Sequence, residues 1–332
     1  MTNERAAALA VLQNNVGFDV PEMWVDYALR HGFRRVKAVT VDRCPDCGGR
    51  PGRSLGQFVY YSTLVRLVEC GACGLAWTNV RLDPTVLMEH FESAYKDEDY
   101  FLEARRAIFD QLVDLIDTLA PSGGRVLDIG GAKGHLMHRV RRRRSDLTVV
   151  LNDLSESATN YATEHFGIPT IAGDAHAVCR DGARYDVVVL SDVLYYEPEI
   201  AVLWSVLPTL MAPRGSVVIR VPNKFHLVRA TQSAKDLLNS PRQRATQVNI
   251  SFFNPEHLLL LSRRYLETRL RNLGFGNIKC LPSPLLHSSA LPNALSDGLF
   301  QFARLANAMS GGRLVTTPSM VVCATSLDAR AR

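Results

Sequence analysis

The sequence predicts an α/β protein, built on a largely parallel sheet with helices on both faces and preceded by a small cysteine-rich module. Three observations support this prediction. From residue 125 onward, continuous apolar runs alternate with segments of helical spacing, as in parallel strands covered on both faces. A glycine-rich turn, in "RVLDIGGAKGHLMHRV" (125–140), follows the first of these runs. Two C-x-x-C pairs precede the whole pattern.

The residues before the sheet divide into three segments. Helix-like apolar spacing covers residues 1–40 and is clearest at 21–32. Residues 41–80 hold the cysteine pairs, and the β-branched and aromatic stretch 57–69 between them predicts a hairpin. Residues 81–120 are expected to be helical again. We therefore expect a module over 1–80, a helical linker or cap over 81–120, and the α/β domain over 121–332.

The α/β domain offers strands and helices in alternation. The predicted strands lie at 125–130, 147–153, 169–174, 185–192, 215–223, 277–282 and 318–326. The later predicted helices lie at 198–211, 224–244, 255–272 and 294–309.

Composition and charge exclude some classes of protein. No run of 18 apolar residues occurs, so no membrane span is expected. The N-terminus carries an early acid and no signal-peptide pattern, so we expect a cytoplasmic protein. The net charge is +5, with basic stretches at 30–37 and 139–144. A basic surface attracts phosphates or nucleic acid, but a solvated helix end and loop is the favoured explanation of such stretches.

The paired cysteines predict a metal site. Cys44 and Cys47 form one pair, Cys70 and Cys73 the other. In a cytosolic protein two such pairs favour zinc over disulfides. Four thiolates fill a tetrahedral site and leave no position for water, so this zinc would be structural. The simpler alternative is that the spacing is coincidental.

The glycine turn indicates which ligand the sheet binds. It lacks the dinucleotide pattern G-x-G-x-x-G and the Gly-Lys-Ser/Thr of a phosphate loop. Instead it reads acid-x-Gly-x-x-x-Gly, from Asp128 through Gly130 to Gly134. A carboxylate at this position suits a ligand with an ammonium group rather than a phosphate. The alternative is a structural acid that holds the loop.

Two more acids follow strands of the predicted sheet. Asp153 ends the second strand, where a carboxylate accepts ribose hydroxyls, and Asp174 ends the third, where a carboxylate accepts an exocyclic amine. Each has a structural alternative, as a helix cap or a turn acid. An amine, a ribose and an adenine without phosphates describe S-adenosylmethionine (SAM).

These segments together resemble the class I SAM-dependent methyltransferases. "VLDIGGAKG", "VVLNDLS", "AGDAH" and "YDVVVLSDVLYYEPE" are similar to their first four motifs, and the resemblance spans about residues 95–325. It implies a Rossmann-like, seven-stranded methyltransferase sheet that ends in an antiparallel pair. It also implies the cofactor-binding residues Asp128, Gly130, Gly131, Gly134, Asp153, Leu154, Asp174, Ala175 and Ser191.

The N-terminal cysteines extend the resemblance. "CPDCGG" and "LVRLVECGACGLAWTNVRLD" look like the zinc ribbon of a subset of these enzymes, which includes sugar C-methyltransferases and enzymes of polysaccharide or antibiotic biosynthesis. The resemblance implies that this module and the following link cap the active site. Tyr100, in the link, would close over the methyl donor.

The segment after the fourth strand departs from the family. Relatives often carry glutamate-histidine there, whereas this sequence has Tyr195-Tyr196. Tyr196 is a candidate to hydrogen-bond a substrate hydroxyl, and His226, past the fifth strand, is a candidate general base. Helix packing and a surface position are their structural alternatives. Asn223 is a candidate to orient the substrate, whereas His135 and His257 are expected to be structural.

We therefore predict methyl transfer from SAM to a small molecule, a sugar or sugar-bearing secondary metabolite. O-methylation is slightly favoured over C- or N-methylation, because the glutamate-histidine pair is missing. One alternative is an RNA methyltransferase whose ribbon binds nucleic acid. The small number of positive charges between the cysteine pairs disfavours this alternative. Another is a methyltransferase fold without catalysis, which the intact acids disfavour.

Overall fold

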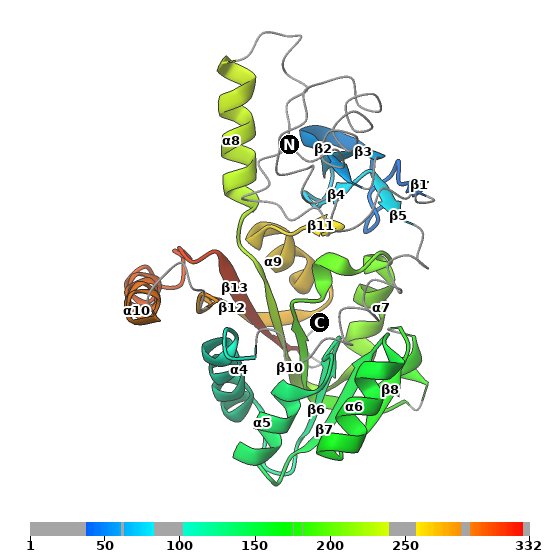
Figure 1. Cartoon of the computed structure of the whole chain (residues 1–332), viewed down its shortest axis with the longest axis vertical. Helices are drawn as coiled ribbons and strands as arrows, with labels where there is room; N and C mark the ends of the chain where they lie inside the picture. The colour runs from blue at the N-terminus through cyan, green and yellow to red at the C-terminus, as the bar shows by residue number, and fades with distance from the viewer. Residues whose placement is uncertain are drawn as a thin grey trace, which may run out of the picture. The chain divides into compact units, whose positions relative to one another are not determined.

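A computed structural model describes residues 38–60, 63–82, 102–174, 176–180, 182–238, 257–286 and 293–327 (Figure 1). The chain divides into two compact units. The first comprises Met1–Leu87 and Lys224–Leu260, and the second comprises Met88–Asn223 and Leu261–Arg332. The predicted helix at 21–32, Tyr100 and Ala175 lie outside the described residues.

The first unit is built around a hairpin. Strands β2 (Pro51–Tyr60) and β3 (Thr63–Cys70) pair antiparallel, which confirms the predicted hairpin. Its sheet continues through β4 (Ala76–Thr78) to β11 (Leu259–Leu260), in the order β11-β4-β3-β2. Helix α8 (Phe225–Leu238) belongs to this unit as well. The buried core of the unit includes Leu55, Phe58, Leu67 and Trp77.

Some expected helices are strands in the structure. The short strands β1 (Ala38–Thr40) and β5 (Val80–Leu82) pair antiparallel, although both fall at the ends of segments predicted to be helical. The predicted helix at 255–272 was wrong in its first part. There Leu259 and Leu260 pair with β4, and helix α9 (Arg263–Asn272) begins only after its cap, Ser262. A run of four leucines fits either structure, and the distant partner strand decides between them.

The second unit contains the seven-stranded sheet that was predicted. Its order is β12-β13-β10-β9-β6-β7-β8. Strands β8, β7, β6, β9 and β10 are parallel, and β13 pairs antiparallel with both β10 and β12. The bounds are β6 (Arg125–Ile129), β7 (Thr148–Asp153), β8 (Thr170–Ala172), β9 (Tyr185–Ser191), β10 (Met211–Pro222), β12 (Phe275–Pro282) and β13 (Ser319–Ser326). All seven predicted strands are confirmed.

Helices lie on the connections between these strands (Figure 1). Apolar side chains of α4 and α5 join those of β6, β7 and β9 in one buried core. The bounds are α4 (Arg106–Leu119), α5 (His135–Arg143), α6 (Glu156–Phe166), α7 (Ile200–Leu210) and α10 (Asn293–Met309), with short 3₁₀ turns η1 (Ala177–Cys179) and η2 (Leu194–Tyr196). None of the helices in the described part of the chain is long and apolar enough to cross a bilayer.

Candidate cofactor site and metal centre

The carboxyl ends of β6, β7 and β8 are tied together by hydrogen bonds around one residue. The backbone carbonyl of Asn152, at the end of β7, accepts from Gly130 N (2.8 Å) and Gly131 N (3.1 Å). Its side-chain amide donates to the carbonyls of Ile171 (2.9 Å) and Gly173 (2.8 Å). The glycine turn therefore lies at the same sheet edge as the ends of β7 and β8, where open α/β sheets bind ligands.

Asp128 is buried at this edge. Its side chain is 2% exposed, and its Oδ1 has no hydrogen-bond partner among the described residues. Burial, followed by the nearby charge of Asp153, raises the pKa of Asp128 to about 8. A buried carboxyl oxygen without a donor is costly. An ammonium group at this position would supply the missing donor and the opposite charge.

The turn next to Asp128 is shaped for close approach. Gly130 has φ +70°, and a Cβ there would lie 2.5 Å from the side chain of Val193. A Cβ on Gly131 would lie 2.7 Å from Asp128 Oδ2. Gly134, with φ +79°, precedes the first residue of α5. Only glycine fits these positions without strain or collision, so the local sequence keeps the space over Asp128 open.

Asp153 holds the turn as well as facing the sheet edge. Its Oδ2 accepts from Ala132 N at 2.9 Å, and its Oδ1 accepts from Ser155 N at 2.9 Å. Ala132 has φ +48°, a left-handed conformation that is unusual for alanine. Each carboxylate oxygen has a second lone pair for a ligand. Asp153 can therefore hold the turn and still accept hydrogen bonds from ribose hydroxyls.

The remaining predicted cofactor residues lie at the same edge or just beyond it. Asp174 Oδ1 accepts from His176 N (3.0 Å) and Ala177 N (3.2 Å), so this acid caps η1. Leu154 is 44% exposed directly after Asp153, which is unusual for a leucine beside a strand end. Ser191 is half-buried at the end of β9.

The two tyrosines after β9 have different surroundings. Tyr195 is buried, and its pKa is raised well above the usual value, first by burial and then by the charge of Asp192. It therefore stays protonated at neutral pH and is no base. Tyr196 is half-buried, with its ring centroid 4.6 Å from that of Tyr195. Of the two, Tyr196 alone is partly exposed.

A buried ion pair lies beside these tyrosines, and the sequence reasoning missed it. The guanidinium of Arg220, on β10, pairs with Asp192, which follows β9. Arg220 Nε also donates to Ser283 Oγ at 2.8 Å, and Arg105 lies 4.0 Å from the Asp192 carboxylate. The sequence feature that could have indicated this pair is the arginine inside the apolar run "VVIRVP", because a buried cation needs a buried acid as its partner.

The remaining candidate residues, three histidines and one asparagine, differ in exposure and in their contacts. His226 is exposed on α8, in the unit that does not contain Asp128 and Tyr196. Asn223 donates its amide to the carbonyls of Val315 (2.9 Å) and Thr317 (3.1 Å), so it anchors a loop. His135 packs against Phe166, with ring centroids 5.3 Å apart. His257 lies in irregular backbone rather than on the expected helix.

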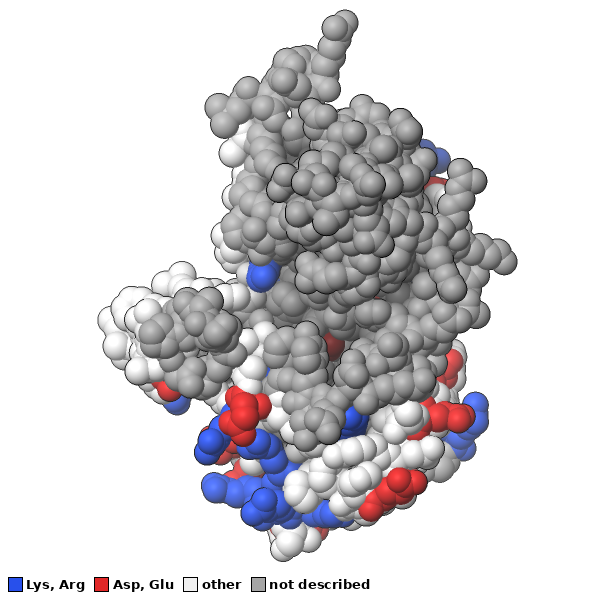
Figure 2. Space-filling view, in the orientation of Figure 1, with Lys and Arg blue, Asp and Glu red and all other residues white. Residues whose placement is uncertain are grey.

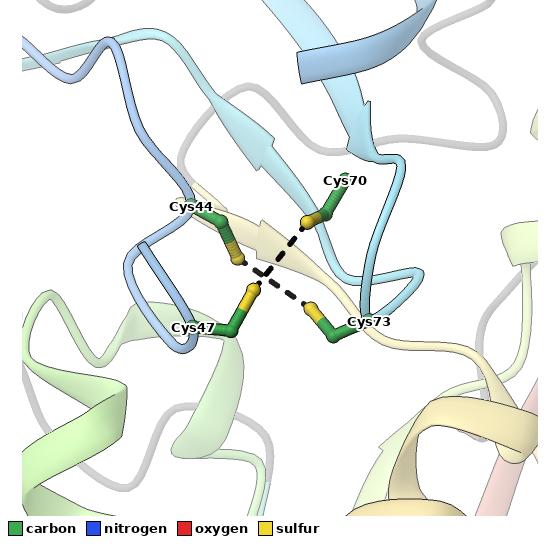
Figure 3. A group of neighbouring side chains, drawn as sticks. All are labelled: Cys44, Cys47, Cys70 and Cys73. Carbon is green, nitrogen blue, oxygen red and sulfur yellow. Dashed lines mark hydrogen bonds between the residues drawn. The ribbon is translucent and has the colours of Figure 1, made fainter. Parts of the chain in front are cut away.

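The four predicted metal ligands converge in the first unit. The sulfur atoms of Cys44, Cys47, Cys70 and Cys73 all lie within 4.8 Å of one another (Figure 3). The Cys44–Cys73 and Cys47–Cys70 sulfur pairs are each 3.5 Å apart. A regular tetrahedron with Zn–S bonds of about 2.3 Å has sulfur–sulfur edges of roughly 3.8 Å. The cluster therefore has the size and the donors that zinc requires.

The backbone around the cysteines forms two similar knuckles. In the first, Gly48 N donates to the Cys44 carbonyl at 2.9 Å; in the second, Gly74 N donates to the Cys70 carbonyl at 3.2 Å. Both glycines have positive φ, +69° and +77°. Hydrogen bonding from Cys73 lowers the pKa of Cys44 to about 5, which favours a thiolate there.

The basic stretch 139–144 is largely engaged within the protein. Figure 2 shows Lys and Arg gathered with acids at the lower end of this view, where α5 ends. Arg139 lies 3.2 Å from Asp110, and Arg144 contacts both Asp117 and Asp146 at 3.0 and 2.8 Å. Local acids therefore offset much of this charge.

Together these observations define a Rossmann-like α/β fold with a candidate cofactor site at the carboxyl edge of its sheet. The sequence profile of the family described as "Methyltransferase domain" matches residues 81–279. The chain belongs to this family, and it is a SAM-dependent methyltransferase.

Several solved structures resemble this chain. A SAM-dependent methyltransferase from Archaeoglobus fulgidus is 17% identical, with a TM-score of 0.44, over 74% of this chain and 100% of that one. The plantazolicin methyltransferase BpumL is 14% identical, with a TM-score of 0.45, over 74% of this chain and 91% of that one. A SAM-dependent methyltransferase from Thermotoga maritima is 15% identical, with a TM-score of 0.47, over 72% of this chain and 99% of that one. No curated protein sequence matched the chain.

Proposed function

We propose that this enzyme methylates a small-molecule acceptor, a sugar or sugar-bearing secondary metabolite, and that it acts on oxygen in preference to carbon or nitrogen. The observation that carries the proposal is the pair Tyr195-Tyr196 after β9. It replaces the glutamate-histidine of the resembling family, and its first member is buried and protonated. Tyr196 is left to hold an acceptor hydroxyl through its phenol.

The cofactor residues are part of the proposal. Asp128 would bind the ammonium of SAM, Asp153 the ribose hydroxyls and Asp174 the adenine amine. Leu154, exposed beside Asp153, would lie against the adenine ring. When bound, SAM supplies a methyl group already activated on a sulfonium. The chain's main contribution is then to place the acceptor in line with that group.

The acceptor side has two candidate residues. Tyr196 would position the hydroxyl that is methylated. His226, on α8, stays the predicted general base. The zinc proposed for the four cysteines would be structural, because no ligand position remains for water or substrate.

The first experiment is calorimetric titration of the purified protein with S-adenosylhomocysteine, after metal analysis. One-to-one micromolar binding is the expected result, whereas folded, zinc-loaded protein without binding would favour a non-catalytic methyltransferase fold.

Acceptors are then tested with SAM labelled in its methyl group. The panel contains sugar nucleotides, phenols, amines and bulk tRNA. Label on a sugar hydroxyl supports the proposal. Label on RNA, or only on amines or carbon, overturns it. Tyr196→Phe and His226→Ala test the two substrate-side residues, and each is expected to lower kcat while leaving S-adenosylhomocysteine affinity unchanged.

A further inference from the structure

Helix α10 presents an apolar stripe that no described part of the chain covers. Its large apolar side chains are exposed, with Phe302 at 68% and Met309 at 80%. The stripe consists of Leu295, Leu299, Phe302, Leu305 and Met309. Steps of three and four residues place all five on one side of the helix.

The opposite side of α10 is already held by its own unit. Ser296, Ala303 and Asn307 are buried there. Asn307 donates its amide to the carbonyls of Cys280 (3.1 Å) and Leu314 (2.8 Å). The rotation of the helix about its axis is therefore fixed, and the stripe faces away from the sheet. The described part of the surface at α10 is mostly white in Figure 2, where charged residues are coloured.

The charges of α10 disfavour a lipid surface as the partner. The helix carries one acid, Asp297, and one base, Arg304. Both lie outside the stripe in helical projection, and together they cancel. A helix that lies on a membrane usually carries several Lys and Arg residues on its polar face. The stripe is therefore better suited to another apolar protein surface.

The spacing of the stripe makes it complementary to itself. In an antiparallel helix pair centred on Phe302, Leu295 faces Met309 of the partner subunit, and Leu299 faces Leu305 of the partner subunit. Phe302 then faces its own copy at the two-fold axis. Gly298 lies on the same side of the helix, and a Cβ at this position would meet no atom within 4 Å, which leaves room for close approach.

We propose that the stripe of α10 is the homodimer interface of this protein, formed by antiparallel pairing with α10 of a second copy. An isologous interface uses the same patch on both subunits, as the stripe allows. The five side chains are between 47% and 80% exposed, and the apolar area that they offer counts toward the roughly 800 Å² per partner of a stable interface. Exposed Leu314, after the helix, adds to this area. The proposal does not depend on the identity of the acceptor.

The test is analytical ultracentrifugation of the full chain over a hundredfold range of concentration. The protein is expected to dimerise. Phe302→Glu is expected to raise the dimer dissociation constant at least about 100-fold, because the substitution places two charges at the centre of the interface. Gln301→Glu adds the same charge next to the stripe, on an exposed polar position, and is expected to leave the dimer intact. Equal S-adenosylhomocysteine binding by both variants shows that they are folded.

A second variant tests the register directly. Phe302→Cys brings two thiols together at the two-fold axis, so mild oxidation is expected to link two chains covalently, whereas the unaltered protein stays unlinked. A monomer at every concentration overturns the proposal and assigns the stripe to another occupant. A dimer that Phe302→Glu leaves intact also overturns it.

Discussion

At the scale of single residues, Asp128 is expected to couple cofactor binding to pH, if it binds the ammonium group as we propose. Its pKa is about 8 in the ligand-free protein because the carboxyl is buried and lies near Asp153. An ammonium group favours the ionised form, so binding releases a proton. Affinity for S-adenosylhomocysteine is expected to fall by up to about tenfold per pH unit as pH decreases from 8 to 6. Calorimetry at three pH values measures this, and a flat profile would contradict it.

The same residue also makes stability depend on pH. A pKa raised above its unfolded value means that the contribution of Asp128 is fully present below about 3.9 and is lost as pH rises through about 8. Asp128→Asn cannot ionise. Its melting temperature relative to the unaltered protein is therefore expected to rise between pH 6 and 9. The same variant should bind cofactor more weakly and without the pH dependence.

Loss of the Asp153 side chain is expected to weaken cofactor binding in two ways. Asp153→Ala removes the proposed ribose ligand and also the acceptor that holds Ala132 in its left-handed conformation. The affinity for S-adenosylhomocysteine should fall at least about tenfold, which corresponds to the loss of one charge-assisted hydrogen bond of about 1.4 kcal/mol. Unchanged affinity in calorimetry would remove Asp153 from the site.

The buried pair of Arg220 and Asp192 gives a prediction about stability. Arg220→Met leaves the buried carboxylate of Asp192 with only the more distant Arg105, at 4.0 Å, and is expected to destabilise the second unit by about 3 kcal/mol. Asp192→Asn should also destabilise it, and asparagine tolerates the φ of +61° there. The double variant should be less destabilised than the sum of the two. Urea unfolding of the four proteins measures this, and additive effects would show that the pair is not coupled.

At the scale of elements, the two cysteine knuckles, with the zinc that we propose for them, are expected to stabilise the first unit and not the second. Cys44→Ser removes one of four ligands, so zinc content should fall below one per chain and the hairpin of β2 and β3 should become sensitive to protease. Affinity of the second unit for S-adenosylhomocysteine should persist. Cys179→Ser is the matched control, because Cys179 lies outside the cluster and its replacement should leave zinc bound. Stoichiometric zinc in Cys44→Ser would refute the four-cysteine site.

At the scale of the whole molecule, the division into two units predicts how the chain tolerates deletion. The first unit takes residues from both 1–87 and 224–260. Deleting 1–87 alone removes the strand that pairs with Leu259 and Leu260, two side chains that are buried in the intact chain. That protein is expected to aggregate. Deleting both segments and joining the ends with a short glycine-serine linker is expected to leave a monodisperse second unit that binds S-adenosylhomocysteine.

Light scattering and calorimetry compare the two shortened proteins. If the protein lacking only 1–87 were monodisperse and well folded, residues 224–260 would not depend on the ribbon for their structure.

The local sequence was sufficient to predict those parts of the protein whose structure depends on residues close together in the chain. Continuous apolar runs indicated the central strands β6, β7, β9 and β10 of the large sheet, because parallel strands are buried on both faces. The spacing within the two C-x-x-C pairs indicated the cysteine cluster. Strand direction alone placed Asp128 and Asp153 at one edge, since carboxyl ends of parallel strands meet there.

Only the tertiary structure decided the features that join distant residues. Thr78 and Leu258, which are 180 residues apart, are hydrogen-bonded, and the strand next to Leu258 forms because β4 is available to pair with it. Arg220 and Asp192 likewise meet because β10 lies beside β9 in the sheet. The sequence by itself therefore determined the methyltransferase fold and the position of the acids at the carboxyl edge of its sheet. The tertiary structure decided which distant segments and charges share a core, because pairing and burial energies depend on partners that local patterns do not specify.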